Sequence, residues 1–315
     1  MKKTLFTLFC TVLLTRASYA AAPSIDTPAK PAAYYVAIVI DDFGNGGADT
    51  ETLANAHIEP DVQAMMDLPI PLTGAVIPGQ PHAPIHAQLL KEKGHGIIVH
   101  LPMAAKKQKA SWDTPFTIAA HLSDEAIRER VKSAIEHVGV ATGLNNHTGS
   151  AATEDLRAMT AVAREVASQG MILLDSVTSG KSKLPEAAQT AGLNTLVRDV
   201  FLDNGKGSMD FTVKRMQETL TVAKKQGHAI AIGHVGPSGG MSTVNGIASM
   251  IEYLEKEGVV FVTLDELHAI LYSDVFNDSE VLADVAETTI LPEIPALDKL
   301  RVPDDVKKPG GKWFQ

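Results

Sequence analysis

Residues 36–44 have the sequence VAIVIDDFG, in which five apolar residues without alternation run into two aspartates and a Phe-Gly pair. A strand that is apolar on both faces is typical of a parallel sheet with both faces covered. In parallel α/β folds, the residues at the carboxyl ends of the strands face the active site. The stretch therefore predicts a parallel α/β fold with Asp41 and Asp42 at its functional edge.

Three further apolar stretches end in polar residues of the same kind. They are residues 97–99 before His100, residues 138–144 before Asn145, Asn146 and His147, and residues 229–232 before His234. Each cluster alone is weak evidence for a site. Four clusters at the same topological position predict one pocket that collects aspartate and histidine from across the chain.

The first twenty residues have the pattern of a signal peptide. A basic start precedes a mostly apolar stretch at residues 4–14 and a small-x-small cleavage signal at residues 18–20. The stretch is too short to span a bilayer as a helix. A buried N-terminal element is the alternative, but the flanks favour cleavage near Ala20 and export to the periplasm or the medium.

Net charge and cysteine content exclude several kinds of site and partner. The single cysteine, Cys10, lies in the signal peptide, so disulfides, thiol catalysis and cysteine metal ligands are excluded from the mature chain. Removal of the signal takes the net charge from −9 to −12. An acidic chain without a basic run argues against nucleic acid and anionic membranes as partners. No later stretch is apolar enough to insert into a membrane.

From residue 34 to residue 272 the pattern alternates strand, loop and helix after an Ala/Pro-rich linker at residues 21–33. The expected strands lie at residues 36–40, 72–77, 97–99, 138–144, 171–174, 196–202, 229–232 and 259–262. This alternation predicts a single-domain (β/α) barrel. An open doubly wound sheet is the competing fold, but no Gly-rich dinucleotide loop follows the first strand.

Two helix starts and the C-terminal end are also predicted. Ser123 and Thr153 are expected to cap helices. Residues 273–315 are acidic and then Pro-rich, which predicts a disordered tail through which a protein partner could bind. His82 and His86 are four residues apart, but the flanking prolines argue against a regular helix, and neither histidine is given a role.

Asp41 and Asp42 are expected to do different work, because neighbouring strand side chains point to opposite faces. One carboxylate can bind a cation while the other handles a proton. The alternative is that they cap a turn or pair with Lys or Arg. Asp42 with His100 and His147 would form a three-ligand zinc site with an open position for water, although a single strand-end histidine is more often structural.

His234 could act as a general acid. Asp175, Arg198, Asp203 and Asn146 are expected to orient these side chains from a second layer. For Arg198, an exposed surface charge at a loop start is an equally good interpretation.

The chain resembles the divergent polysaccharide deacetylase family, a branch of the carbohydrate deacetylase superfamily, over nearly all of residues 34–272. The resemblance rests on five landmarks in order: Ile40–Gly44, His100–Met103, Asn146–Ser150, Asp175-Ser176 and Gly233-His234. It implies a distorted (β/α) barrel with seven or eight parallel strands. It also implies removal of N- or O-acetyl groups from glycans with a divalent metal.

Residue by residue, the resemblance matches Asp41 to the catalytic base, Asp42 to a metal ligand, His100 to the first metal histidine and His234 to the histidine that protonates the leaving group. Ala104 stands where the main superfamily has a second histidine. Residues 145–148 replace its Arg-Pro-Pro-Tyr loop, and we infer that His147 supplies the missing ligand.

The sequence therefore predicts an exported hydrolase that removes acetyl groups from an envelope glycan, with zinc as the first choice of metal. Two other functions stay open. An inactive barrel could bind a glycan or an envelope protein, which the loss of the second histidine favours. A glycosidase could use two carboxylates, for example Asp42 and Asp175, without a metal.

Overall fold

A computed structural model describes residues 33–45, 58–107, 114–203 and 207–272. The expected signal peptide and tail lie outside these residues, as does nearly all of the linker. The described part contains these strands: β1 (Tyr34–Phe43), β2 (Thr73–Val76), β3 (Gly96–Met103), β4 (Gly143–Thr148), β5 (Ile172–Asp175), β6 (Thr195–Val197), β7 (Val200–Phe201), β8 (His228–His234) and β9 (Val259–Val262). Every strand pair is parallel.

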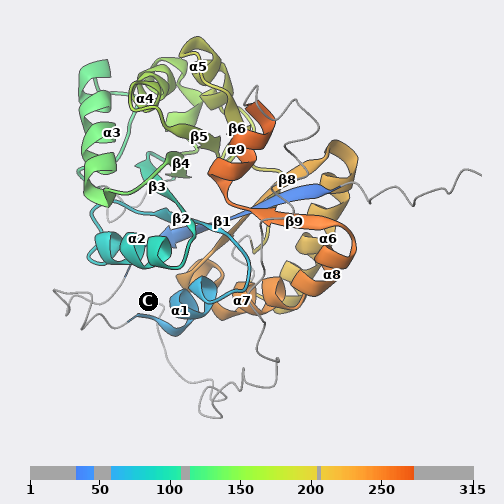
Figure 1. The fold of residues 1–315 in the computed structure, drawn as a ribbon. Helices are drawn as coiled ribbons and strands as arrows, with labels where there is room; N and C mark the ends of the chain where they lie inside the picture. The colour runs from blue at the N-terminus through green and yellow to red at the C-terminus, as the bar shows by residue number, and fades with distance from the viewer. Residues whose placement is uncertain (1–32, 46–57, 108–113, 204–206, 273–315) are drawn as a thin grey trace, which may run out of the picture. The chain divides into compact units, whose positions relative to one another are not determined.

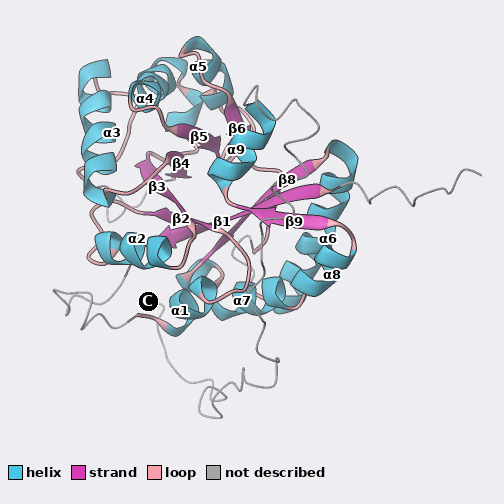
Figure 2. Cartoon of the chain, in the orientation of Figure 1, coloured by secondary structure: helices cyan, strands magenta, loops and turns pink. Residues whose placement is uncertain are grey.

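Helices alternate with these strands and surround the sheet (Figures 1 and 2). They are α1 (Pro60–Met66), α2 (Ala83–Glu92), α3 (Asp124–Val138), α4 (Leu156–Ser168), α5 (Leu184–Thr190), α6 (Met209–Gln226), α7 (Gly240–Ala248), α8 (Ile251–Lys256) and α9 (Leu264–Tyr272). None of the helices in the described ranges is both long and apolar enough to cross a membrane.

The strand order is that of a distorted barrel, as predicted. It runs β6-β5-β4-β3-β2-β1-β8-β7, and β9 pairs with the first half of β1. The chain passes from β6 to β7 through Arg198 and Asp199. Their backbone N–H groups donate to Asp175 O and Ile230 O, which belong to β5 and β8. This segment therefore joins the two ends of the strand order.

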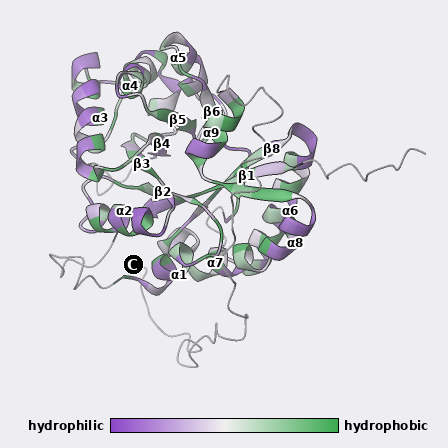
Figure 3. Cartoon of the chain, in the orientation of Figure 1, coloured by the Kyte–Doolittle hydropathy of each residue, from purple (hydrophilic) through white to green (hydrophobic). Residues whose placement is uncertain are grey.

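Two hydrophobic clusters explain why the strands are apolar on both faces. A small cluster inside the barrel includes Ala37, Val39, Ile98, Leu174 and Ile232. The alternate residues of each strand pack outward in a larger cluster shared with the helices. Figure 3 shows the hydrophobic strands enclosed by helices whose outer faces are hydrophilic.

Helix α9 covers the amino-terminal end of the barrel interior. Leu264 and Leu267 belong to the inner cluster. The Leu264 backbone N–H donates to the Thr73 hydroxyl at 2.8 Å, which ties the start of α9 to the start of β2. The inner core is thus covered at one end by α9, and polar residues are left to line the other end.

Some element boundaries differ from those predicted. The strand expected at residues 138–144 begins at Gly143, because α3 continues to Val138 and ends at Gly139 with φ 83°. Asp155, not Thr153, caps α4 by accepting from Ala158 N, whereas Ser123 caps α3 as expected. Helix α2 is regular despite Pro84, because proline is tolerated in the first turn.

Candidate active site

The polar residues of the site lie on the same strands as the inner core and point to the same side of the sheet. Val39, Ile98 and Ile232 face inward, and two residues further along the same strands lie Asp41, His100 and His234. Since side chains alternate along a strand, these three project to the same interior. The three strands extend through these residues, so Asp41, His100 and His234 lie near the carboxyl ends of the strands and not in the loops that follow.

Asp42 reaches the same pocket by a backbone irregularity. The pairing of β1 with β2 shifts register between Ile40 and Phe43, and Asp42 has φ 73°. Regular alternation would have turned its carboxylate away from that of Asp41. The expectation that the two side chains face opposite sides is therefore wrong, and both line one pocket.

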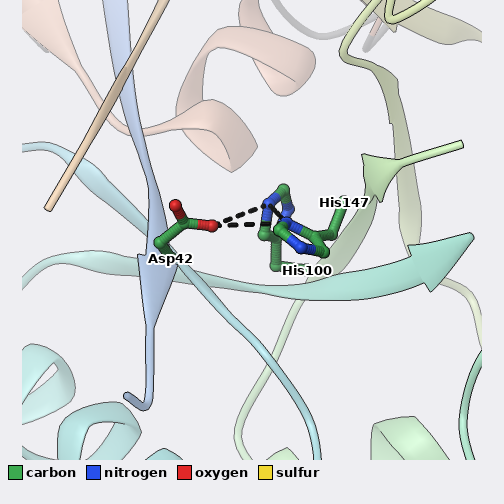
Figure 4. Close-up of side chains that lie close together, drawn as sticks. All are labelled: Asp42, His100 and His147. Carbon is green, nitrogen blue, oxygen red and sulfur yellow. Dashed lines mark hydrogen bonds and ion pairs between the residues drawn. The ribbon is translucent and has the colours of Figure 1, made fainter. Parts of the chain in front are cut away.

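Three potential ligand atoms meet in this pocket (Figure 4). Asp42 Oδ1 lies 3.6 Å from His100 Nε2 and 3.3 Å from His147 Nδ1. The two histidine nitrogens are 3.0 Å apart. Ligands about 2.0–2.2 Å from a tetrahedral zinc ion would be separated by about 3.3–3.6 Å. Asp42 Oδ1 is also buried and has no hydrogen-bond partner among the described residues, so these three residues fit a divalent metal.

His147 comes from β4, the neighbour of the strand that carries His100. On β4, Asn145 and His147 alternate with Asn146, so the first two share the inward face. The register places His147 beside Pro102 of β3, one inward position beyond His100. A histidine from the neighbouring strand thus lies next to His100, with the two ring nitrogens 3.0 Å apart.

Asn145 connects Asp41 to His100. Its Nδ2 donates to Asp41 Oδ1 at 2.9 Å and to Ser176 Oγ at 3.1 Å. Its Oδ1 faces His100 Nδ1, 2.7 Å away, and accepts a hydrogen bond from the Nδ1–H group. Sequence reasoning assigned no role to Asn145. The signal that could have found it is its position two residues before His147 on an alternating strand.

The electrostatics of the site favour a positive charge. Burial raises the pKa of the Asp42 carboxyl, but contacts with His100 and His147 outweigh this and hold that pKa below its usual range. Burial lowers the pKa of the His100 ring, whereas the Asp41 charge and contacts with Asp42 raise it, and the net direction is upward. Two carboxylates around buried ring nitrogens stabilise a cation between them, whether a proton or a metal ion.

His234 is held by Asp203. Its backbone N–H donates to Asp203 Oδ2 at 2.7 Å, and its ring Nδ1 lies 2.8 Å from Asp203 Oδ1. Burial lowers the pKa of His234, but the hydrogen bond to Asp203 and the charges of Asp41, Asp203 and Asp42 raise it to about 9. The raised pKa favours the protonated ring, whose Nδ1–H donates to Asp203 Oδ1.

The other predicted orienting residues hold the segment after β5. Asn146 Oδ1 accepts from Ser176 N at 2.9 Å, and Asp175 Oδ1 accepts from Val177 N at 2.8 Å. Arg198 donates from Nε to Ser176 O at 2.8 Å and from Nη2 to Val177 O at 3.3 Å. These contacts hold Ser176 at the pocket, which Asn146 also lines, whereas Asp175 and Arg198 act only through this segment.

The pocket at the carboxyl ends of the strands has a volume of about 370 Å³. Its lining includes all five residues predicted as ligands or catalysts: Asp41, Asp42, His100, His147 and His234. A second pocket of about 210 Å³ shares Asp42 and His147 with the first. Asp42 and His147 thus line both pockets.

Comparison with known families identifies the family of the chain. The sequence matches the family described as divergent polysaccharide deacetylase over residues 38–268, which include all the site residues above. The chain belongs to this family. The resemblance drawn from the five landmarks is confirmed.

Two curated relatives match most of this chain. It is 32% identical over 261 residues to uncharacterized protein YibQ of Escherichia coli, covering 82% of this chain and 73% of that protein. It is also 32% identical over 233 residues to an uncharacterized protein of Haemophilus influenzae, covering 74% of each.

Two solved structures are similar to this chain to different degrees. The uncharacterized protein ATU2773 of Agrobacterium tumefaciens matches with a TM-score of 0.65 at 19% identity, over 75% of this chain and 89% of that one. This likeness supports the barrel fold. Bacillus subtilis PdaA, a family 4 carbohydrate esterase, has a TM-score of 0.43 at 13% identity, over 77% of this chain and 84% of that one.

Proposed function

We propose that this protein is an exported metal-dependent hydrolase that removes acetyl groups from an envelope glycan. One observation carries the proposal: three ligand atoms 3.0–3.6 Å apart share a pocket with a second carboxylate and a histidine paired to a buried aspartate. The family supports the reaction class. Zinc is the preferred metal, because one carboxylate and two imidazoles suit it.

Asp42, His100 and His147 would hold the metal. When bound, a divalent ion polarises the acetyl carbonyl and lowers the pKa of water. Asn145 keeps the proton of His100 on Nδ1 and so leaves Nε2 as the ligand atom. The buried carboxylate of Asp42 neutralises part of the metal charge.

Asp41 and His234 would move the protons. Asp41 Oδ2 lies 3.6 Å from His100 Nε2, beside the proposed metal position, while Oδ1 is held by Asn145. Asp41 can therefore take a proton from the attacking water with Oδ2. His234 lines the same pocket and its raised pKa favours the protonated ring, so it can donate a proton to the departing amine or alcohol.

The two other functions are less well supported. The carboxylate pair named for a glycosidase, Asp42 with Asp175, does not share the pocket, because Asp175 accepts from Val177 N and does not line it. An inactive binding barrel was favoured by Ala104, yet His147 offers the ligand that Ala104 lacks. Turnover decides between binding and catalysis.

The proposal is tested by acetate release from a panel of N- and O-acetylated envelope glycans. The zinc-loaded protein should release acetate from at least one glycan, and chelation should stop it. Asp41→Asn should bind zinc and release no acetate. Glycan binding without acetate release from any member, by zinc-loaded protein, would instead support the inactive barrel.

A further inference from the structure

A second group of potential ligands lies beside the start of α2. One ligand atom from each of Glu59, His82 and His86 lies within 4.8 Å of the others. His82 and His86 are almost fully buried. Glu59 Oε2 and His86 Nε2 have no hydrogen-bond partner among the described residues. The spacing alone would fit a second metal ion.

The hydrogen bond between Gly44 and His86 argues against that ion. Gly44 N–H donates to His86 Nδ1 at 2.9 Å, inside the protein. A neutral imidazole that accepts at Nδ1 carries its proton on Nε2. A ligand histidine has the opposite arrangement, with a free lone pair toward the metal and N–H toward an acceptor. A neutral His86 therefore carries its proton on Nε2 and has no free lone pair for a metal ion.

Gly44 is held on both sides by the start of α2. Its carbonyl accepts from His82 N at 3.0 Å, while its N–H donates to His86. Gly44 has φ 105°, and a Cβ there would lie 3.1 Å from Ile77 O and 3.2 Å from Ala83. The site thus requires glycine and fixes both of its peptide groups.

Gly44 is two residues from Asp42 in the sequence. Asp42 has φ 73°, a left-handed conformation that L-residues adopt only when the surroundings enforce it. Phe43 between them is fully buried, and its carbonyl accepts from Ile77 N at 2.8 Å. The ring of His86 also packs edge-on against Phe43, with centroids 6.0 Å apart.

We propose that His86 is a positioning residue for Asp42: by accepting the Gly44 N–H it fixes the backbone that turns the Asp42 carboxylate into the metal site. Burial together with the charge of His82 lowers the pKa of His86 to about 4, so the ring stays a neutral acceptor at neutral pH. The inference rests on the proposed metal role of Asp42.

The test is zinc affinity, measured by competition with a chromogenic chelator, in variants of the acceptor. His86→Phe keeps the ring but leaves Gly44 N–H unpaired, and should weaken zinc binding about tenfold or more. Asparagine places an oxygen near the Nδ1 position, so His86→Asn should restore affinity to less than about tenfold below the wild type. If His86→Phe does not fold, His86→Gln replaces it, because its longer side chain carries the polar atoms past the Nδ1 position.

His95→Phe is the matched control. His95 is also buried, and its Nε2 contacts a backbone carbonyl, Met66 O, at 2.9 Å. This variant should lose similar thermal stability and keep wild-type zinc affinity. Equal zinc affinity in folded His86→Phe and wild type would overturn the inference. So would two zinc ions per wild-type chain and one in His86→Phe. A wild type that binds no zinc would refute the proposed function instead.

Discussion

Asn145 sets the tautomer of His100, because its Oδ1 lies 2.7 Å from His100 Nδ1 while its Nδ2 is committed to Asp41 and Ser176. Asn145→Leu keeps the volume and removes these bonds. We expect zinc affinity to fall about 10–100-fold, as for other residues that orient ligands. Asn194→Leu, at an exposed position, is the control. Unchanged zinc affinity in Asn145→Leu would show that His100 does not need this partner.

Removing the proposed general acid should separate turnover from metal binding. His234→Asn retains a donor near Asp203 but cannot release a proton to the leaving group. We expect acetate release to fall at least about 100-fold, in the range of general acid catalysis, with the zinc content unchanged. Loss of zinc in this variant would make His234 a ligand and would contradict its separate role.

The pH dependence of turnover should have a basic limb set by His234. Its pKa is raised to about 9, so the protonated form is present below that pH and is lost as the pH rises through it. A bound cation offsets the charges of Asp41 and Asp42 and so lowers the pKa of His234. The rate should therefore fall at a pH between about 6.5, the ordinary pKa of histidine, and about 9.

Asp203→Asn provides the test of this assignment. It removes the hydrogen-bonded charge that raises the pKa of His234. The basic limb of kcat/KM should therefore move to lower pH, with zinc affinity kept. A limb at the same pH in both proteins would assign it to another group.

Backbone strain at Val177 predicts a stabilising substitution. Val177 has φ 51°, which is unfavourable for a β-branched residue and acceptable for asparagine. Relief of about 1 kcal/mol should raise Tm by about 2–4 °C for Val177→Asn in a domain of this size. Val197→Asn, at an exposed strand position without positive φ, should give no increase. A lower Tm for Val177→Asn would contradict this account.

The parallel fold and the residues at its carboxyl edge could be predicted because they depend on local patterns. The apolar run before Asp41 requires burial on both faces, and that requirement is met by the two clusters on either side of β1. Strand alternation then carries the inward face on to Asp41, His100 and His234.

The contacts that orient the site could not be predicted, because they join residues far apart in sequence. Nothing near Asp42 shows that its backbone is left-handed, since that depends on β2 and α2 packing around Phe43 and Gly44. Choosing Asn145 over Asn146 required the correct start of β4, which the expected strand at residues 138–144 placed too early. Pro84 likewise argued against a regular helix at this position, although that helix brings His86 to Gly44.

The most direct test of the metal centre is a crystal structure of the zinc-loaded protein with anomalous data at the zinc edge. The account predicts one strong peak about 2.0–2.2 Å from Asp42 Oδ1, His100 Nε2 and His147 Nδ1. A peak that His147 does not contact, or zinc held by Glu59, His82 and His86 instead, would contradict it.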